Sequence, residues 1–373
     1  MRIPAVDLRP ALEETRACWQ ARVGEVFGRM HFILGEEGVA FEAEFAREMG
    51  AKHAVGCGNG TAAIELCLRD AGITSAKQEV LTTPLTAPFT GVGIAAAGAR
   101  PRFADVDPRT LLLDPGDAGN RLTRRTAALV AVHLYGMPCA MERLCALCRD
   151  RSLVLIQDAA QAHGATYRGR PLTAWSRYVT YSFYPTKNLG CLGDGGAIAT
   201  GSRPAAARLR ARRDGGRVPG SADMVSRLEG INSRLDELQA CFLRAFLPRL
   251  AGWNAHRARV AALYREALAD CAGVELPQAV EGGVQHLFPV LADGRDRLRA
   301  FLRDRGIGSG VHYPVPLHLH PAFRDCGLKR GDLPVAERAC RRLVSLPLWS
   351  HLPLEQAAEA AEAVRAFYRS GIR

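Results

Sequence analysis

Residues 181–190 of this chain are Tyr-Ser-Phe-Tyr-Pro-Thr-Lys-Asn-Leu-Gly, a stretch that sets Lys187 among small and aromatic residues. Only four lysines occur in 373 residues, so a role as a solubilising surface charge is less favoured for this one. Upstream, residues 153–158 are Leu-Val-Leu-Ile-Gln-Asp, which puts an acid, Asp158, directly after an apolar run of strand length. Two strands that end in polar loops in this way are typical of an α/β fold.

Lys187 and Asp158 together are the two groups that pyridoxal phosphate (PLP) requires. A lysine amine holds the cofactor aldehyde as a Schiff base, and a carboxylate against the pyridine nitrogen keeps that nitrogen protonated, so that the ring accepts electrons. Each group alone has a simpler explanation. A lysine near a turn is usually at the surface, and an Asp at this place can cap a helix. The pair predicts a PLP site.

Length and composition predict an ordinary globular protein with two domains, which we place at residues 1–250 and 251–373. No apolar run approaches the roughly 20 residues of a membrane span, and the first residues lack the apolar stretch of a signal peptide. Eleven scattered cysteines, an odd number, indicate reduced thiols. We expect a cytoplasmic protein without a membrane partner. Cys145 and Cys148 fit the buried face of a helix better than a metal site, and we expect no metal.

The formal charge of +11 comes mainly from 45 arginines, many of them on helical stretches. This pattern is typical of solvated helix faces. Neither a dense basic stripe nor an aromatic stacking platform is present, so we do not expect a nucleic-acid partner. An anionic small substrate such as a nucleotide diphosphate fits the charge better, because the guanidinium fork meets phosphate oxygens two at a time.

Strand and helix signals alternate along the first two thirds of the chain, which favours an α/β layer architecture. The pattern then shifts to long arginine-rich helices and a few strands, which indicates a second, smaller domain at the carboxy terminus. Strands are expected at 53–57, 79–82, 101–105, 127–133, 153–157, 178–182, 196–200 and 286–291, and helices at 61–71, 89–97 and 141–149.

Ligands of open α/β sheets bind beyond the carboxyl ends of the strands, and three loops of this chain lie there. Residues 56–63, Gly-Cys-Gly-Asn-Gly-Thr-Ala-Ala, lead from a strand into a helix and offer free amides to a phosphate. Alone, a glycine turn of this kind is usually just a turn. The second loop follows Asp158. The third contains Ser182, which could donate to the phosphate, and Lys187. The combination of the three indicates one site.

With these three loops the chain resembles the DegT/DnrJ/EryC/StrS family of PLP-dependent sugar aminotransferases, which have the aspartate aminotransferase-like fold. The resemblance implies a three-layer large domain with a mostly parallel sheet and a smaller α+β carboxy-terminal domain, and it covers nearly the whole chain. It is carried by the segments 31–35 (His-Phe-Ile-Leu-Gly), 59–63, 105–107 (Asp-Val-Asp), 132–136, 158–164 (Asp-Ala-Ala-Gln-Ala-His-Gly), 182–190, 193–196, 232–239 and 312–314 (His-Tyr-Pro).

The resemblance also implies roles for individual residues. Lys187 would be the Schiff-base lysine and the general acid and base, and Asp158 the partner of the pyridine nitrogen. The remaining assignments are Gln161 as partner of the ring hydroxyl, Gly60, Thr61, Ala62 and Ser182 as phosphate ligands, Asn232 as a phosphate ligand donated by the second subunit, and His312, Tyr313 and Phe89 as substrate-pocket residues. The role of Asn232 makes a homodimer with shared active sites part of the expectation. For His312 and Tyr313 a structural loop is an equally good interpretation.

Two departures from the family pattern concern the ring face and the sugar contacts. The family usually has Thr followed by an aromatic that packs on the cofactor ring, whereas residues 86–89 here are Thr-Ala-Pro-Phe. Either Phe89 or Pro88 could cover the ring. The segment 215–226 lacks the His and Tyr that are frequent in the family.

The function implied by the resemblance is amino transfer from L-glutamate to a keto group of a nucleotide-linked sugar. Residues 31–35 look most like the subgroup that acts on dTDP-linked 3-keto-6-deoxyhexoses. The alternatives are an aminotransferase for a cyclitol ketone, a PLP-dependent sugar dehydratase, and a non-catalytic protein of the same fold. Dehydratases of the family carry His in place of the lysine, and a non-catalytic member should have lost a central residue. This chain retains Lys187, Asp158 and Gln161.

Overall fold

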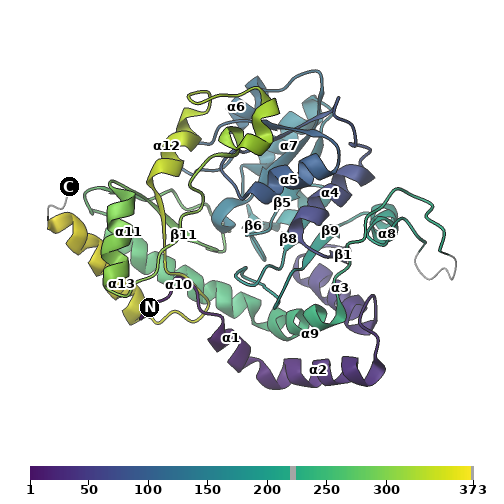
Figure 1. Cartoon of the computed structure of the whole chain (residues 1–373), viewed down its shortest axis with the longest axis horizontal. Coiled ribbons are helices and arrows are strands. Elements are labelled where there is room, and N and C mark those ends of the chain that lie inside the picture. Colours follow the sequence, from purple (N-terminus) through teal and green to yellow (C-terminus); the bar gives the residue numbers. More distant parts are fainter. Residues whose placement is uncertain (219–223, 371–373) are drawn as a thin grey trace.

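The computed structural model describes residues 1–218 and 224–370, and within them seven strands form one central sheet (Figure 1). The order is β1-β9-β8-β5-β4-β2-β3, and β9 runs antiparallel to both of its neighbours while the other neighbouring pairs are parallel. The strands are β1 (His53–Cys57), β2 (Glu79–Thr82), β3 (Arg100–Phe103), β4 (Thr126–Val132), β5 (Val154–Asp158), β8 (Tyr178–Ser182) and β9 (Gly196–Thr200).

Helices cover both faces of this sheet because successive strand residues point to opposite sides. In β4, Val130 packs with the helices of one face, and Leu129 packs with those of the other. The first face is covered by α4 (Gly60–Asp70), α5 (Pro88–Ala96) and α8 (Arg203–Arg212). The second is covered by α3 (Glu36–Glu48), α6 (Pro115–Asn120), α7 (Met141–Asp150) and α9 (Glu237–Phe246). The predicted three-layer α/β architecture is confirmed.

A smaller antiparallel sheet lies in the carboxy-terminal part of the chain, in the order β10-β11-β12. Its strands are β10 (Val274–Glu275), β11 (Phe288–Ala292) and β12 (Leu343–Leu346), packed with α10 (Leu250–Leu268), α11 (Arg295–Asp304) and α13 (Leu354–Arg369). Ile3 from the amino terminus is fully buried in the same core. Other elements are α1 (Arg9–Glu14), α2 (Arg16–Arg29), α12 (Pro334–Arg342), β6 (Thr166–Tyr167), β7 (Arg170–Pro171) and 3-10 turns at Leu134–Gly136, Leu172–Ala174, Leu247–Arg249, Leu317–Leu319 and Pro321–Cys326.

Helix α10 joins the two cores. Its first turns bury Leu250 and Trp253 in the core of the large sheet, and its later turns bury Val260 and Tyr264 in the core of the small sheet. The change of core along one continuous helix accompanies the change of composition noted in the sequence. The division of the chain after residue 250 stays a prediction.

Element boundaries differ from expectation where a polar contact ends a strand. The expected strand 101–105 ends at Phe103, because the Asp105 carboxylate accepts the amides of Val335 and Ala336 at 2.9 and 2.8 Å and so binds the start of α12. The expected strand 286–291 begins only at Phe288, because the His286 amide donates to the Tyr135 carbonyl at 2.8 Å.

Three observations on the described residues concern membranes, metals and redox chemistry. None of the helices there combines the length and apolarity needed to cross a bilayer. In the same ranges no cluster of three or more His, Cys, Asp and Glu side chains is placed to hold a metal ion. Cys148 is buried on α7, Cys145 is half-buried beside it, and all eleven cysteines are free thiols.

Candidate active site

The predicted loops converge at one edge of the large sheet. Asp158 is the last residue of β5, and Ser182 is the last residue of its parallel neighbour β8. Gly60 starts α4 soon after β1 ends. Carboxyl ends of parallel strands meet at the same edge, which is where α/β proteins bind their ligands. The structure therefore brings Gly60, Asp158, Ser182 and Lys187 to one place.

The start of α4, at Gly60 and Thr61, is suited to bind a phosphate, and we call it the phosphate corner. Asn59 caps the helix, and its Oδ1 accepts the Ala62 amide at 2.8 Å. Within the described part of the chain the amides of Gly60 and Thr61 have no acceptor. Free amides at a helix start, with the positive end of the helix dipole, suit an anion. The amides available to a phosphate thus narrow to Gly60 and Thr61, since Ala62 is already engaged.

Close backbone contacts form this corner and explain its glycines. A methyl group at Gly60 would lie 2.9 Å from the Cβ of Ser182, so only glycine lets α4 approach the end of β8 this closely. A methyl group at Gly196 would lie 2.4 Å from the carbonyl carbon of Asn59. Ser182 is half-buried, and its Oγ accepts the Tyr184 amide at 3.3 Å. The Ser182 hydroxyl hydrogen therefore remains able to donate to a phosphate.

Asp158 is buried at the floor of the site, with 5% of its surface exposed. Its Oδ2 accepts a hydrogen bond from Thr90 Oγ1 at 2.8 Å, and its Oδ1 accepts the Ala160 amide at 3.1 Å. Burial raises the pKa of the Asp158 carboxyl, while the two hydrogen bonds and nearby Lys187 oppose that rise. A carboxylate held in this way suits a cationic partner such as a protonated pyridine nitrogen.

Thr90 is the residue that the sequence reasoning missed. It lies in the first turn of α5, and its hydroxyl also contacts Thr86 Oγ1 at 3.2 Å. The sequence offers only a weak signal for it, two threonines four residues apart, which places both hydroxyls on one side of a helix start. Contact with Asp158 depends on how α5 packs over the sheet.

Lys187 is half-buried in the loop after β8, and its amide donates to the Tyr184 carbonyl at 2.9 Å. Removal from water lowers the pKa of the Lys187 amine to about 8, and the Asp158 carboxylate works against that lowering. About one amine in ten is then neutral at pH 7, against about one in 2,500 for an ordinary lysine. The Lys187 amine is therefore a usable base and nucleophile.

Gln161 and the two predicted substrate residues form a second cluster. Gln161 Oε1 accepts the Tyr135 amide at 2.6 Å, and its Nε2 donates to the Tyr313 hydroxyl at 3.1 Å. Tyr135 in turn donates its hydroxyl to the His312 carbonyl at 2.5 Å. The second hydrogen on Gln161 Nε2 has no acceptor among the described residues, so it could donate to a ring hydroxyl.

Two predicted residues lie apart from this cluster in the single chain. Asn232 is exposed and is held by backbone pairing with Asp214. Residues 214–218 and 224–232 extend from the body beside α8 (Figure 1). Phe89 is 63% exposed at the start of α5, so its place over a cofactor ring stays a prediction. Residues 219–223, within the segment noted for its missing His and Tyr, lie outside the described residues.

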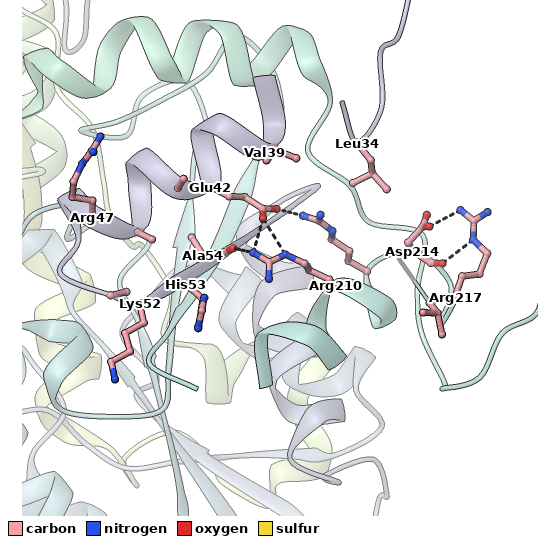
Figure 2. A pocket seen from close by; sticks show the side chains of 15 residues that line it. Leu34, Val39, Glu42, Arg47, Lys52, His53, Ala54, Arg210, Asp214 and Arg217 are labelled. Carbon is pink, nitrogen blue, oxygen red and sulfur yellow. Dashed lines mark hydrogen bonds and ion pairs between the residues drawn. The ribbon is translucent and has the colours of Figure 1, made fainter. Parts of the chain in front are cut away.

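A hollow with a volume of about 640 Å³ lies elsewhere, between α3, β1 and α8 (Figure 2). Glu42 stands in its wall and accepts hydrogen bonds from Arg210 and Arg213, whereas Arg47 and Lys52 extend away from that carboxylate. The Glu42 cluster ties α3 to α8. None of the described residues that line this hollow is a predicted site residue.

Comparison with known proteins decides the family. The sequence profile of the DegT/DnrJ/EryC1/StrS aminotransferase family matches residues 14–365. This chain belongs to that family. The predicted fold, the aminotransferase class and the PLP cofactor are thereby confirmed.

Relatives of known name resemble the chain over nearly its whole length. The dTDP-3-amino-3,4,6-trideoxy-alpha-D-glucose transaminase of Streptomyces venezuelae is 42% identical, over 98% of this chain and 96% of that protein. The pleiotropic regulatory protein of Geobacillus stearothermophilus is 40% identical, over 99% of each chain. The crystal structure of S. venezuelae DesV in complex with a ketimine intermediate matches with a TM-score of 0.94, at 42% identity and 98% coverage of both chains.

Proposed function

We propose that this member of the DegT/DnrJ/EryC1/StrS family transfers an amino group from L-glutamate to the keto group of a nucleotide-linked hexose, with a dTDP-linked 3-keto-6-deoxyhexose as the acceptor. One observation carries the proposal: an amine with a pKa lowered to about 8, Lys187, lies at the same sheet edge as the buried Asp158 and the free amides of Gly60 and Thr61. That set combines a base, an acid partner and a phosphate corner.

The residues at this edge fit PLP. The amides of Gly60 and Thr61 and the Ser182 hydroxyl would hold its phosphate, and the Asp158 carboxylate would hold the ring nitrogen. The free Gln161 hydrogen would meet the ring hydroxyl. Bound PLP supplies an aldehyde and an electron-accepting ring. Asp158 keeps that ring cationic because its own charge is retained by Thr90 and the Ala160 amide.

Lys187 moves the proton. Its Nζ would carry a proton from the Cα of the amino donor to the aldehyde carbon of the cofactor in the first half of the cycle, and from that carbon to the former carbonyl carbon of the acceptor in the second. A base works best when its pKa lies near the operating pH, and burial brings Lys187 there. His312 and Tyr313 would line the substrate side, because Tyr313 contacts Gln161 directly.

The choice of acceptor is supported by the names of relatives. Two transaminases for dTDP-3-amino-3,4,6-trideoxy-alpha-D-glucose, from Streptomyces venezuelae and Micromonospora megalomicea, are 42% and 40% identical to this chain. The excess of arginine, which gives a formal charge of +11, suits an acceptor that carries a diphosphate.

The test is amino transfer measured directly. Purified protein with PLP and L-glutamate is given either a dTDP-linked 3-keto-6-deoxyhexose, the matching UDP-linked ketosugar or a cyclitol ketone, and 2-oxoglutarate is quantified. The proposal expects 2-oxoglutarate in amounts equal to the aminated sugar, with the dTDP substrate preferred. Conversion of the cyclitol ketone alone would contradict the acceptor class, and no turnover with any donor would contradict the reaction.

A homodimer with shared active sites is part of the proposal. The segment that carries Asn232 also exposes Val218, Met224 and Val225, at 45%, 79% and 50%. Val39, at 66% exposure, lies in the wall of the hollow between α3 and α8 together with Val218. Apolar side chains gathered in this way favour contact with a second copy of the chain. The partner would then receive Asn232 at its phosphate corner.

Mixed dimers test the sharing of sites. Asn232→Ala and Lys187→Ala chains are each expected to be impaired alone. A mixed dimer contains one site with a native Lys187 and a native Asn232, so random mixing should restore about a quarter of native activity. Mixtures that remain as inactive as their components would refute the shared site.

A cytoplasmic location is also proposed, since the eleven free thiols suit a reducing compartment.

A further inference from the structure

The side chain that follows Lys187 is fully engaged in hydrogen bonds. Asn188 is 3% exposed, and its Nδ2 donates to Asn254 Oδ1 at 2.8 Å and to the Val284 carbonyl at 3.1 Å. Its Oδ1 lies 2.9 Å from His286 Nδ1. All three hydrogen-bonding functions of this buried amide are therefore satisfied, which fixes its orientation.

The orientation of Asn188 also fixes the hydrogen on His286. Because both Nδ2 hydrogens of Asn188 are donated elsewhere, its Oδ1 accepts, and His286 must carry a hydrogen at Nδ1. Burial, together with the charges of Lys187 and Arg257, places the pKa of His286 well below its ordinary value, so the ring is neutral. The backbone amide of His286 donates to the Tyr135 carbonyl at 2.8 Å.

Asn254 connects this amide to the loop that bears the acid. It lies on α10, and its Nδ2 donates to the His163 carbonyl at 2.9 Å. His163 belongs to the loop after β5, which also contains Asp158 and Gln161. One side chain of α10 thus bonds both the lysine loop and the acid loop, although neither loop is near α10 in sequence.

The Lys187 amine itself has no hydrogen-bond partner among the residues that the structure describes. The position of the amine is therefore set by the backbone from which the side chain extends. That backbone is anchored on one side by the hydrogen bond from the Lys187 amide to the Tyr184 carbonyl, and on the other by the side chain of Asn188. We propose that Asn188, His286 and Asn254 are positioning residues that hold the Lys187 amine at a fixed distance from Asp158. This inference rests on the proposed role of Lys187 as the proton carrier.

The experiment measures the Lys187 amine without reference to turnover. The full-length chain, freed of cofactor, is treated with a trace of acetic anhydride across a pH series, and acetylation of each lysine is quantified by mass spectrometry. The chain supplies internal references, because the other three lysines, Lys52, Lys77 and Lys329, are exposed. In the native protein Lys187 should reach half of its maximal labelling near pH 8, against about 10.4 for a lysine in a model peptide.

Loss of the anchor should let water reach the amine. In Asn188→Ala the half-labelling pH of Lys187 should rise by about one unit toward the references, which lowers its neutral fraction at pH 8 by about fivefold. The groups facing Lys187 are Asp158, His163, His286 and His312, and all remain in this variant. In the assembled enzyme kcat should fall while KM for the amino donor stays unchanged.

Partner variants and a control separate positioning from general loosening. Asn254→Ala should also raise the half-labelling pH of Lys187, and the double variant Asn188→Ala/Asn254→Ala should raise it by less than the sum of the two single variants, because the bond between Asn188 and Asn254 is lost in both. His286→Leu should raise the half-labelling pH of Lys187. His286→Asn keeps a donor at the place of Nδ1, so its Lys187 should keep the native half-labelling pH. Tyr264→Phe is the control, since it removes a buried bond of α10, to the Pro347 carbonyl at 3.0 Å, away from the lysine loop.

The outcomes are distinguishable even if one variant fails to fold. Should Asn188→Ala not fold, the His286→Leu and His286→Asn pair carries the same comparison. A native half-labelling pH in these variants, or an equal shift in Tyr264→Phe, would overturn the positioning role and leave the aminotransferase proposal standing. A native protein whose Lys187 labels with the exposed lysines would remove the low-pKa amine on which both proposals rest.

Discussion

Replacing Thr90 by valine tests how the buried carboxylate of Asp158 is kept ionised. Valine has nearly the volume of threonine but lacks the hydroxyl that donates to Asp158 Oδ2 at 2.8 Å. Both residues are almost completely buried, so water cannot replace the lost donor. A hydrogen bond to a charged group contributes about 1.5–3 kcal/mol, which corresponds to a rise of about one to two units in the pKa of Asp158.

The rise in the pKa of Asp158 should weaken the binding of PLP. Only the ionised carboxyl pairs with a cationic ring nitrogen, so the variant should bind PLP more weakly at pH values where its Asp158 is protonated, by about 10- to 150-fold at most. Affinity should fall as the pH is lowered, because Asp158 then takes up a proton. This fall should begin at a higher pH in the variant than in the native protein, since the pKa of its Asp158 is higher.

Titration of the cofactor-free protein with PLP, followed by absorbance at several pH values, measures this effect. Thr90→Ser should behave like the native protein, because it keeps the hydroxyl. Thr86→Val is the matched control, since it removes only the 3.2 Å contact with Thr90 and leaves Asp158 untouched. A Thr90→Val protein with native affinity and a native pH profile would refute the reasoning.

Three further changes have expected outcomes of their own. Gly60→Ala puts a methyl group 2.9 Å from the Cβ of Ser182 and should weaken PLP binding in the same titration, whereas Gly201→Ala, which meets nothing within 4 Å, should not. Glu237→Gln removes a charge that accepts three amides at the start of α3, at 2.8–3.0 Å, and should lower the free energy of unfolding in denaturant by about 2–3 kcal/mol; an unchanged midpoint would contradict this. Lys187→Ala should carry no cofactor mass after borohydride reduction, whereas retained mass would place the covalent link on another lysine.

Much of the fold followed from local pattern. The strands 53–57, 79–82, 178–182 and 196–200 were predicted with the bounds that the structure has. These runs are apolar and are bounded by turn residues, so the pattern alone defines them. The bounds of the other strands were wrong by one or two residues, and in two of these strands a contact with a distant partner lies at the wrong end. Asp105 binds the start of α12, a contact between residues far apart in sequence that no local window contains.

The sequence by itself determined the chemistry that this chain can perform. An acid after one buried strand, a lysine after another and a glycine turn before a helix come to the same edge if the three strands run in the same direction in one sheet, because their carboxyl ends share that edge. Their identity and order therefore predicted Lys187, Asp158 and the corner at Gly60.

Only the tertiary structure decided which groups support them. Thr90 reaches Asp158 through the packing of α5 on the sheet, and Asn254 reaches the lysine loop across α10. The Ala62 amide donates to Asn59, and the amides proposed to hold the phosphate are therefore those of Gly60 and Thr61, while the predicted role of Ala62 stays a prediction. Such contacts depend on the distances between side chains of separate elements, and the sequence encodes these distances only through the packing of the whole chain.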